Sequence, residues 1–279
     1  MAGNPDLMAW VNTVAFSPGG QLLATGSADT KIRLWHLETQ KLLYTLSGHT
    51  GAVTTLSISA DGKLLASGSA DQTIKLWQLA SGNLLHTLTA HTGAVTTVAL
   101  SPQGQTLVSG SYDQTIKIWN LQTRTIIYSF LAHQGSVNTV AFSPYWEFLA
   151  STGDDKTIKI WQLATGKLLH TLSGSTHAAR SIAFHPLGLS HQTALLASGS
   201  VDQTVKLWSM PTRPGAIALQ LRHTLSGHTG EVCSVAFSAD GQLLASSGAD
   251  KTIKLWSALT YEFLQTLEGH EGGHPVCRV

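Results

Sequence analysis

Short apolar segments separated by turn residues run along the whole chain, and apolar and polar positions alternate within them with the period of a β-strand. Residues 52–88 show the pattern clearly. Turns rich in Ala, Asp, Gln, Ser and Gly join four such segments, at 52–59, 64–69, 74–77 and 84–88. The pattern therefore predicts a unit of four short strands.

The unit recurs along the chain. Tryptophans follow one another at intervals of 42, 42, 42, 47 and 48 residues, each with an aspartate six residues before it and a serine or threonine ten residues before it. A histidine precedes four of the tryptophans by 28 residues. These residues are Trp35, Trp77, Trp119, Trp161, Trp208 and Trp256; Asp29, Asp71, Asp113, Asp155, Asp202 and Asp250; Thr25, Ser67, Ser109, Ser151, Ser198 and Ser246; and His49, His91, His133 and His228. A single unit has therefore been copied at least six times.

Strands this short cannot bury both of their faces within one unit, so consecutive units must stack sheet against sheet. The predicted fold is an all-β propeller, one domain over 1–279, with six complete four-stranded blades. The predicted blades cover about 9–46, 49–88, 91–130, 133–172, 175–225 and 228–267. Gly269-His270 begins a truncated seventh repeat, 269–279.

These repeats resemble those of the WD40 family, whose marks are Gly-His before the first strand, a hydroxyl on the second, Asp in the next turn and Trp on the third strand. The resemblance covers nearly the whole chain. The Asp that usually follows the Trp is absent, as in Trp35-His36 and Trp77-Gln78. Arrays this regular are similar to bacterial ones that follow kinase, protease or NTPase domains, which favours a fragment or C-terminal part of a larger protein.

The resemblance also implies a hydrogen-bonded network of the His, Ser, Asp and Trp within each blade. The chemistry suits it, because indole only donates, carboxylate only accepts, and Ser and His do both. The alternative is a Ser-His-Asp hydrolase triad. Six copies of one catalytic site serve no purpose, the Trp leaves no room for an attacking water, and no Gly-x-Ser-x-Gly motif occurs. We therefore expect the network to be structural.

Two copies depart from the pattern, and we expect their blades to be weaker. Ser175 stands at the histidine position of the fifth copy, with His177 two residues later, and Leu7 stands there in the first. Two histidine groups could suggest a metal: His177, His185 and His191, and His270, His274 and Cys277. Neither has the spacing or the complete set of a known site, so we expect no metal and no cofactor.

Positions that differ between the copies are the candidates for partner recognition. The resemblance implies a binding face made by the loops before the first strand and between the second and third. Most copies have small residues there, and aromatic or Arg side chains are typical interface anchors. The exceptions are Trp10, Tyr112, Asn138, Asp154, Arg180 and Glu231. We expect Tyr112, Asn138, Asp154 and Arg180 along one arc, with Tyr145 and Trp146 on opposite hairpins. The alternative is that these positions vary by neutral sequence drift on a rim that is exposed to solvent.

Composition excludes several partners. The chain has 17 Lys and Arg against 16 Asp and Glu, a net charge of +1, so we expect no nucleic acid and no anionic membrane surface. No apolar run approaches the ~20 residues of a membrane span. Two cysteines, no Asn-x-Ser/Thr sequence and no signal-peptide features in residues 1–10 favour the cytoplasm.

These observations favour a non-catalytic scaffold or sensor module that binds a protein or peptide. The alternative is a propeller-type hydrolase or lyase with a site in the central channel, although the predicted innermost strands offer mainly Val, Thr, Ala, Ser and Phe. Open blade edges would allow self-association.

Overall fold

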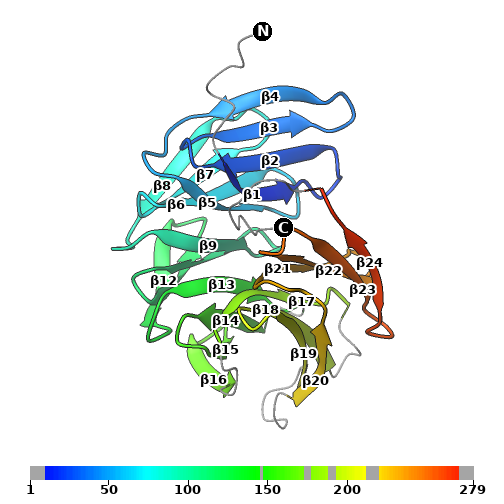
Figure 1. Ribbon diagram of the computed structural model, residues 1–279. Coiled ribbons are helices and arrows are strands. Elements are labelled where there is room, and N and C mark those ends of the chain that lie inside the picture. Colours follow the sequence, from blue (N-terminus) through cyan, green and yellow to red (C-terminus); the bar gives the residue numbers. More distant parts are fainter. Residues whose placement is uncertain (1–9, 145–146, 173–176, 188–192, 212–219, 270–279) are drawn as a thin grey trace. The chain divides into compact units, whose positions relative to one another are not determined.

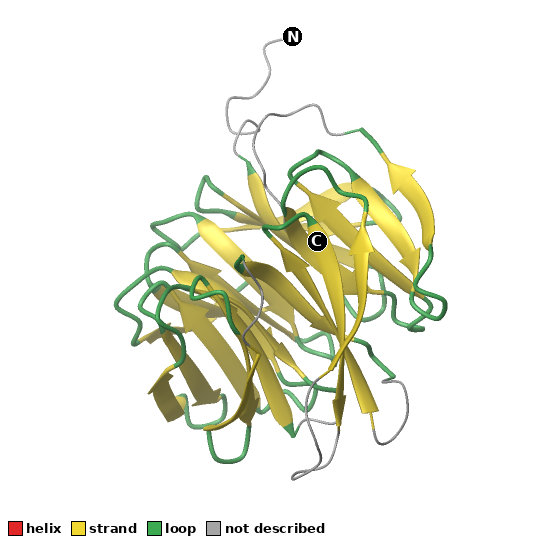
Figure 2. Ribbon diagram, turned by 60° about the horizontal axis from the view of Figure 1, so that its bottom comes forward, coloured by secondary structure: helices red, strands yellow, loops and turns green. Residues whose placement is uncertain are grey.

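Every regular element in the described part of the protein is a β-strand (Figure 2). The computed structural model describes residues 10–144, 147–172, 177–187, 193–211 and 220–269. Within these ranges, 24 strands form six antiparallel sheets of four, and no helix occurs. The prediction of an all-β propeller with four-stranded blades is confirmed.

The four strands of each blade follow chain order across the sheet. Blade 1 contains β1 (Val11–Phe16), β2 (Leu22–Ser27), β3 (Ile32–His36) and β4 (Lys41–Leu46). Blade 2 contains β5 (Val53–Ile58), β6 (Leu64–Ser69), β7 (Thr73–Gln78) and β8 (Leu84–Thr89). Blade 3 contains β9 (Val95–Leu100), β10 (Thr106–Ser111), β11 (Thr115–Asn120) and β12 (Thr125–Leu131). The strands of blade 2 differ from the predicted segments by only one or two residues at their ends.

Blades 4 to 6 have the same order. Blade 4 contains β13 (Val137–Phe142), β14 (Phe148–Gly153), β15 (Ile158–Gln162) and β16 (Lys167–Leu172). Blade 5 contains β17 (Ala179–Phe184), β18 (Thr193–Ser200), β19 (Thr204–Pro211) and β20 (Gln220–Ser226). Blade 6 contains β21 (Val232–Phe237), β22 (Leu243–Gly248), β23 (Ile253–Ser257) and β24 (Phe263–Leu267).

The chain divides into two compact units. Residues 1–132 hold blades 1 to 3, and residues 133–279 hold blades 4 to 6 (Figure 1). Within each unit, the first strand of one blade packs against the first strand of the next, as β1 does against β5 and β17 against β21.

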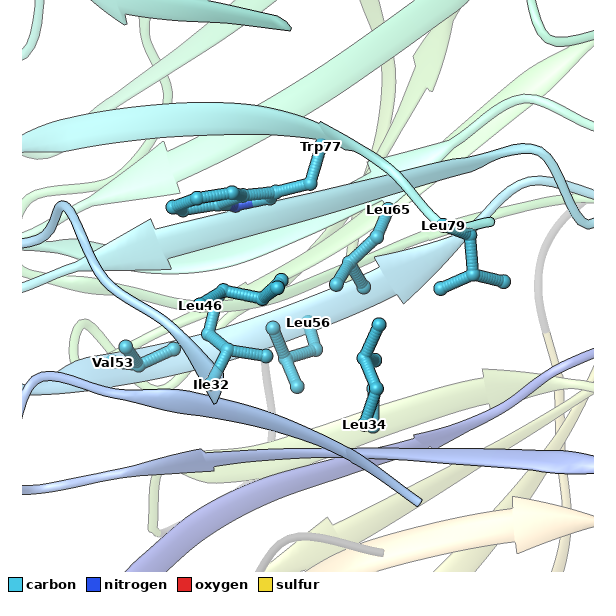
Figure 3. Close-up of a cluster of buried hydrophobic side chains, with 9 residues drawn as sticks. Ile32, Leu34, Leu46, Val53, Leu56, Leu65, Trp77 and Leu79 are labelled. Carbon is cyan, nitrogen blue, oxygen red and sulfur yellow. The ribbon is translucent and has the colours of Figure 1, made fainter. Parts of the chain in front are cut away.

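The hydrophobic cores lie between neighbouring blades of a unit. In Figure 3, Ile32, Leu34 and Leu46 of blade 1 gather with Val53, Leu56, Leu65, Trp77 and Leu79 of blade 2. Equivalent clusters join blade 2 to blade 3, blade 4 to blade 5, and blade 5 to blade 6. Stacking therefore buries the apolar faces that a single blade would leave in water.

Each blade carries two β-bulges at fixed places. One adds a residue to the first strand, and the other adds a residue to the fourth strand opposite the Trp. The first-strand residues are Asn12, Thr54, Thr96, Asn138, Arg180 and Cys233. The bulged Asn12 donates to the Val53 carbonyl at 3.0 Å and Asn138 to the Ala179 carbonyl at 3.2 Å, so these bulges link adjacent blades.

A small residue on the second strand makes room for the next blade. A Cβ added at Gly68 would lie 2.6 Å from Val95 Cγ1, and Gly26 and Gly199 meet Val53 and Val232 in the same way. Blade 4 has Thr152 at the glycine position, and blade 5 has Ala179 at the valine position. The larger side chain of Thr152 is thus matched by the smaller side chain of Ala179 on the next blade.

Candidate functional site

The structure brings His49, Ser67, Asp71 and Trp77 of blade 2 together in one buried chain of hydrogen bonds. His49 Nδ1 lies 2.8 Å from Asp71 Oδ2, and His49 Nε2 lies 2.7 Å from Ser67 Oγ. Trp77 Nε1 donates to the same Ser67 Oγ at 2.8 Å. Because indole can only donate, the Ser67 hydroxyl gives its own proton to His49 Nε2, and His49 gives its Nδ1 proton to Asp71.

Blades 3, 4 and 6 repeat this arrangement. Their His to Asp contacts measure 2.8–2.9 Å, their His to Ser contacts 2.7–2.8 Å, and their Trp to Ser contacts 2.8–2.9 Å. The residues are His91, Ser109, Asp113 and Trp119; His133, Ser151, Asp155 and Trp161; and His228, Ser246, Asp250 and Trp256. All four serines of the complete sets are 0% exposed, so a substrate cannot reach the hydroxyl.

Each of these aspartates also fastens the segment before the first strand to the turn after the second. Asp71 accepts from the Thr50 N–H at 2.9 Å and from Thr73 Oγ1 at 2.7 Å. Burial alone would raise the pKa of Asp71, but hydrogen bonds from Thr73, Thr50 and His49 outweigh it and lower the pKa to about 2. The pKa values of Asp113, Asp155 and Asp250 are also lowered to about 2, by the same balance.

The network histidines of blades 2, 3 and 4 are held in their neutral form. Burial lowers the pKa values of His49, His91 and His133 below the usual 6.5, and the hydrogen bond and charge of the neighbouring Asp only partly oppose this. The neutral state agrees with the directions of the hydrogen bonds, since each His must accept the serine proton at Nε2.

Sequence reasoning missed a basic residue that stands two positions before every Trp. In blades 2 and 3 it donates to a hydroxyl on the fourth strand, with Lys75 Nζ 2.9 Å from Thr87 Oγ1. In blades 1 and 5, which lack the motif histidine, it lies closest to the turn aspartate: Arg33 lies 2.6 Å from Asp29, and Lys206 contacts Asp202. In blade 4, where the histidine is present, Lys159 Nζ lies 3.8 Å from Asp155. The signal was present in all six copies, as Arg33, Lys75, Lys117, Lys159, Lys206 and Lys254.

Four of the six predicted partner-binding residues lie together in the second unit. Asn138 Nδ2 donates to Asp154 Oδ1 at 3.0 Å, and Arg180 Nη1 donates to the same oxygen at 3.1 Å. Arg180 Nε lies 3.6 Å from Glu231 Oε2. These residues form a polar ladder across blades 4, 5 and 6, in which Asp154 and Arg180 are exposed.

The other two predicted residues, Trp10 and Tyr112, belong to the first unit. Their exposed fractions are 56% and 63%, and Tyr112 lies on blade 3, in the turn between β10 and β11. On blade 2, the residue equivalent to Tyr112 is Ala70.

The histidines considered for a metal have other surroundings where they are described. His185 is buried; its Nε2 donates to the Gly241 carbonyl at 2.8 Å, and its Nδ1 accepts from the Leu187 N–H at 3.2 Å. His177 is exposed. Outside the described residues lie Leu7, Tyr145, Trp146, Ser175, His191, His270, His274 and Cys277.

The described part of the chain contains no group of three or more His, Cys, Asp or Glu residues arranged to hold a metal ion. Among the same residues, no helix has the length and apolar character needed to cross a membrane.

Comparison with known proteins identifies short matching segments in several relatives. The chain is 40% identical over 48 residues to the general transcriptional corepressor TUP1 of Saccharomyces cerevisiae, which covers 17% of this chain and 7% of that protein. It is 46% identical over 44 residues to periodic tryptophan protein 2 of Arabidopsis thaliana, covering 16% and 5%. It is 57% identical over 37 residues to the probable serine/threonine-protein kinase PkwA of Thermomonospora curvata, covering 13% and 5%. The matches thus span less than a tenth of each relative's length.

The family model described as "WD domain, G-beta repeat" matches most of the chain, in six segments: 7–36, 40–78, 82–120, 124–162, 166–209 and 219–257. The segment 40–78, for example, runs from the start of β4 to the Trp-bearing strand β7 of the next blade. The six matches, the four-stranded blades and the repeated His, Ser, Asp and Trp all agree, and the chain belongs to the WD40 repeat family.

Proposed function

We propose that the chain is a non-catalytic protein–protein interaction module that binds a peptide or protein at the ends of its blades. One observation carries this proposal: the His, Ser and Trp of the four complete networks are buried, whereas four of the six candidate residues, Trp10, Tyr112, Asp154 and Arg180, are exposed. Ser67 is fully buried in its network, while Tyr112 and Trp10 project into solvent. The shared residues hold the blade, so the exposed variable residues are available to a partner.

The polar ladder of the second unit supports a protein partner. Arg180 is flanked by Asp154 and Glu231, and exposed ion pairs of this kind contribute only about 0–1 kcal/mol to stability. A partner can therefore replace these contacts at little cost. Charges of both signs suit a protein or peptide better than a polyanion.

The names of the matched relatives point the same way. One is named a corepressor and another a probable kinase. Similar repeats thus occur in proteins with different named roles, as expected of a module that recruits partners rather than performing the chemistry itself.

A pull-down with the purified protein tests the proposal. We expect the parent to recover a protein partner and the Tyr112→Ala/Arg180→Ala variant to lose about tenfold or more of it, a typical loss for interface anchors. Leu259→Ala, at an exposed position of blade 6, is the control. A partner held equally well by the double variant would contradict the assigned residues.

Two further measurements separate the other possibilities. Recovery that falls steeply between about 50 and 200 mM salt would indicate a polyanionic ligand instead. Light scattering of the isolated protein tests self-association through open blade edges, and a monomer mass at every concentration would exclude it.

A further inference from the structure

Leu131 is exposed at a place where the other described blades have a polar residue. It ends β12, and 68% of its surface is open to solvent. The equivalent residues of blades 1, 2, 5 and 6 are also exposed and are Ser47, Thr89, Ser226 and Glu268. A single exposed leucine is ordinary in a folded protein. Leu131 becomes a candidate binding residue because Tyr112 is also exposed on the same blade.

Tyr112 breaks the repeat at the same end of blade 3. Leu131 pairs with Thr115, the first residue of β11, and the Ala132 N–H donates to the Gln114 carbonyl at 2.9 Å. Tyr112 lies in the turn that leads into β11, two residues before Gln114. The two most exposed large apolar side chains of the blade therefore belong to one end of one sheet.

The backbone that carries Tyr112 is fixed. The Tyr112 N–H donates to the Ala94 carbonyl at 3.0 Å. Gly93 packs so closely beneath the turn that an added Cβ would lie 2.8 Å from the Asp113 nitrogen. In blade 2, a Cβ added at Gly51 would lie 2.7 Å from the Asp71 nitrogen. An aromatic ring on a fixed turn loses little freedom on binding. Blade 2 has the same close glycine contact beneath its turn. Substitutions that swap the residues at positions 70 and 112 should therefore leave both turns unchanged.

No charged side chain of blade 3 competes for this end of the sheet. The charged residues within 91–132 are Asp113, Lys117 and Arg124. Asp113 is bonded to His91 and Thr115, and Lys117 is buried and bonded to Ser129. Arg124 precedes β12 in the turn at the opposite end from Leu131.

We propose that Tyr112 and Leu131 form an anchor site for an apolar side chain of a partner peptide, with uncharged residues flanking that side chain. The inference rests on the proposed function and specifies the partner chemistry at blade 3. The absence of exposed charge selects an uncharged segment, and the two apolar side chains supply the contact area that a leucine, methionine or phenylalanine would bury.

A displayed library of random 12-residue peptides, selected on the parent protein, provides the probe. The affinity of each selected peptide is then measured by fluorescence polarisation on Tyr112→Ala/Leu131→Thr, which gives blade 3 the residues that blade 2 carries as Ala70 and Thr89. We expect apolar, uncharged peptides whose affinity falls at least about tenfold on this variant. Leu259→Thr, at a leucine that is 72% exposed on blade 6, should leave affinity unchanged.

The reverse exchange tests sufficiency. Ala70→Tyr/Thr89→Leu places the same pair on blade 2, and we expect the number of peptide sites to rise from one to two. Urea unfolding of each variant shows that the fold is retained. Selected peptides that bind Tyr112→Ala/Leu131→Thr as tightly as the parent, or a selection that yields none, would overturn the inference. Peptides lost on Arg180→Ala instead would overturn it while leaving the proposed function intact.

Discussion

A neutral imidazole is the form of His49 that satisfies every partner in its blade. A protonated ring would direct a second donor at Ser67 Oγ, which already accepts from the Trp77 indole. The Ser67 proton would then have to turn to the Lys75 carbonyl, 3.4 Å away. The network thus selects both the tautomer and the charge of the histidine.

Removing one of these histidines should be costly. His228 is buried and bonded to Asp250 and Ser246, each at 2.8 Å. We expect His228→Ala to lower the free energy of unfolding by about 1–3 kcal/mol, because it leaves buried polar groups without a partner. His177→Ala, at an exposed position of blade 5, should cost clearly less. Equal losses in urea titrations of the two variants would contradict the structural role.

The basic residue two positions before the Trp should matter most where the motif histidine is missing. Lys206→Met leaves Asp202 without its cation, and we expect a loss of about 1.5–3 kcal/mol, typical of hydrogen bonds to charged groups. Lys75→Met removes only a bond to Thr87, while Asp71 keeps His49 and Thr73. Urea unfolding should therefore give a lower free energy of unfolding for Lys206→Met than for Lys75→Met. The opposite order would contradict the idea that Lys206 takes the place of the missing histidine.

At the scale of the strands, the bulges protect the outer edge of each sheet. The fourth strands pair on one side only, and each has an extra residue opposite the Trp, such as Leu43 or Leu85. A bulge twists an edge strand and disrupts its hydrogen-bonding ladder, and this discourages pairing with another chain. Lys41 and Lys167 add charge to two of these strands.

The matched side-chain sizes of Thr152 and Ala179 can be tested by placing the same pair of residues at Gly68 and Val95. Gly68→Thr should clash with Val95 and destabilise the protein by about 1–3 kcal/mol. Adding Val95→Ala reproduces the pair Thr152 and Ala179 of blades 4 and 5, so the double variant should be less destabilised than the sum of the single variants. A double-mutant cycle in urea measures the coupling, and strict additivity would show that the two positions are independent.

Most of the fold could be predicted because each strand is short and bounded by turn residues, and because Trp and Asp fix its place in the repeat. The bulges could not, because an extra residue such as Thr54 is visible only in the pairing of the backbone. The left-handed backbone of Gln72, with φ of 70°, was equally hidden, since a non-glycine residue rarely adopts it. The exposure of Leu131 could not be predicted, because leucines near the ends of other fourth strands, such as Leu46 and Leu88, are buried.

At the scale of the whole molecule, the repeated networks make stability depend on pH. The pKa values of His49, His91 and His133 are lower in the folded protein than their ordinary 6.5. The unfolded chain therefore takes up protons more readily as the pH falls through 6.5, and stability declines. The turn aspartates, with pKa values of about 2 against an ordinary 3.8, add a second loss at lower pH.

We therefore expect the urea midpoint to be highest near neutral pH, lower at about pH 5 and lowest at about pH 3. The first decline reports the histidines and the second the aspartates. Replacing His49, His91 and His133 together by Gln should flatten the first decline and leave most of the second, because each Asp keeps the hydrogen bonds from the neighbouring Thr and backbone N–H groups. A urea midpoint of the parent that stays constant from about pH 7.5 to 5 would show that the histidines have the same pKa values in the folded and the unfolded protein.

The proton shared between each motif histidine and its aspartate also gives the protein a set of built-in reporters. It is held on Nδ1 inside blades 2, 3, 4 and 6, where the imidazole is shielded from water. Such a proton exchanges with solvent only when its own blade opens. Four imidazole resonances, each belonging to a different blade, would let magnetic resonance follow the opening of individual blades in one unlabelled molecule.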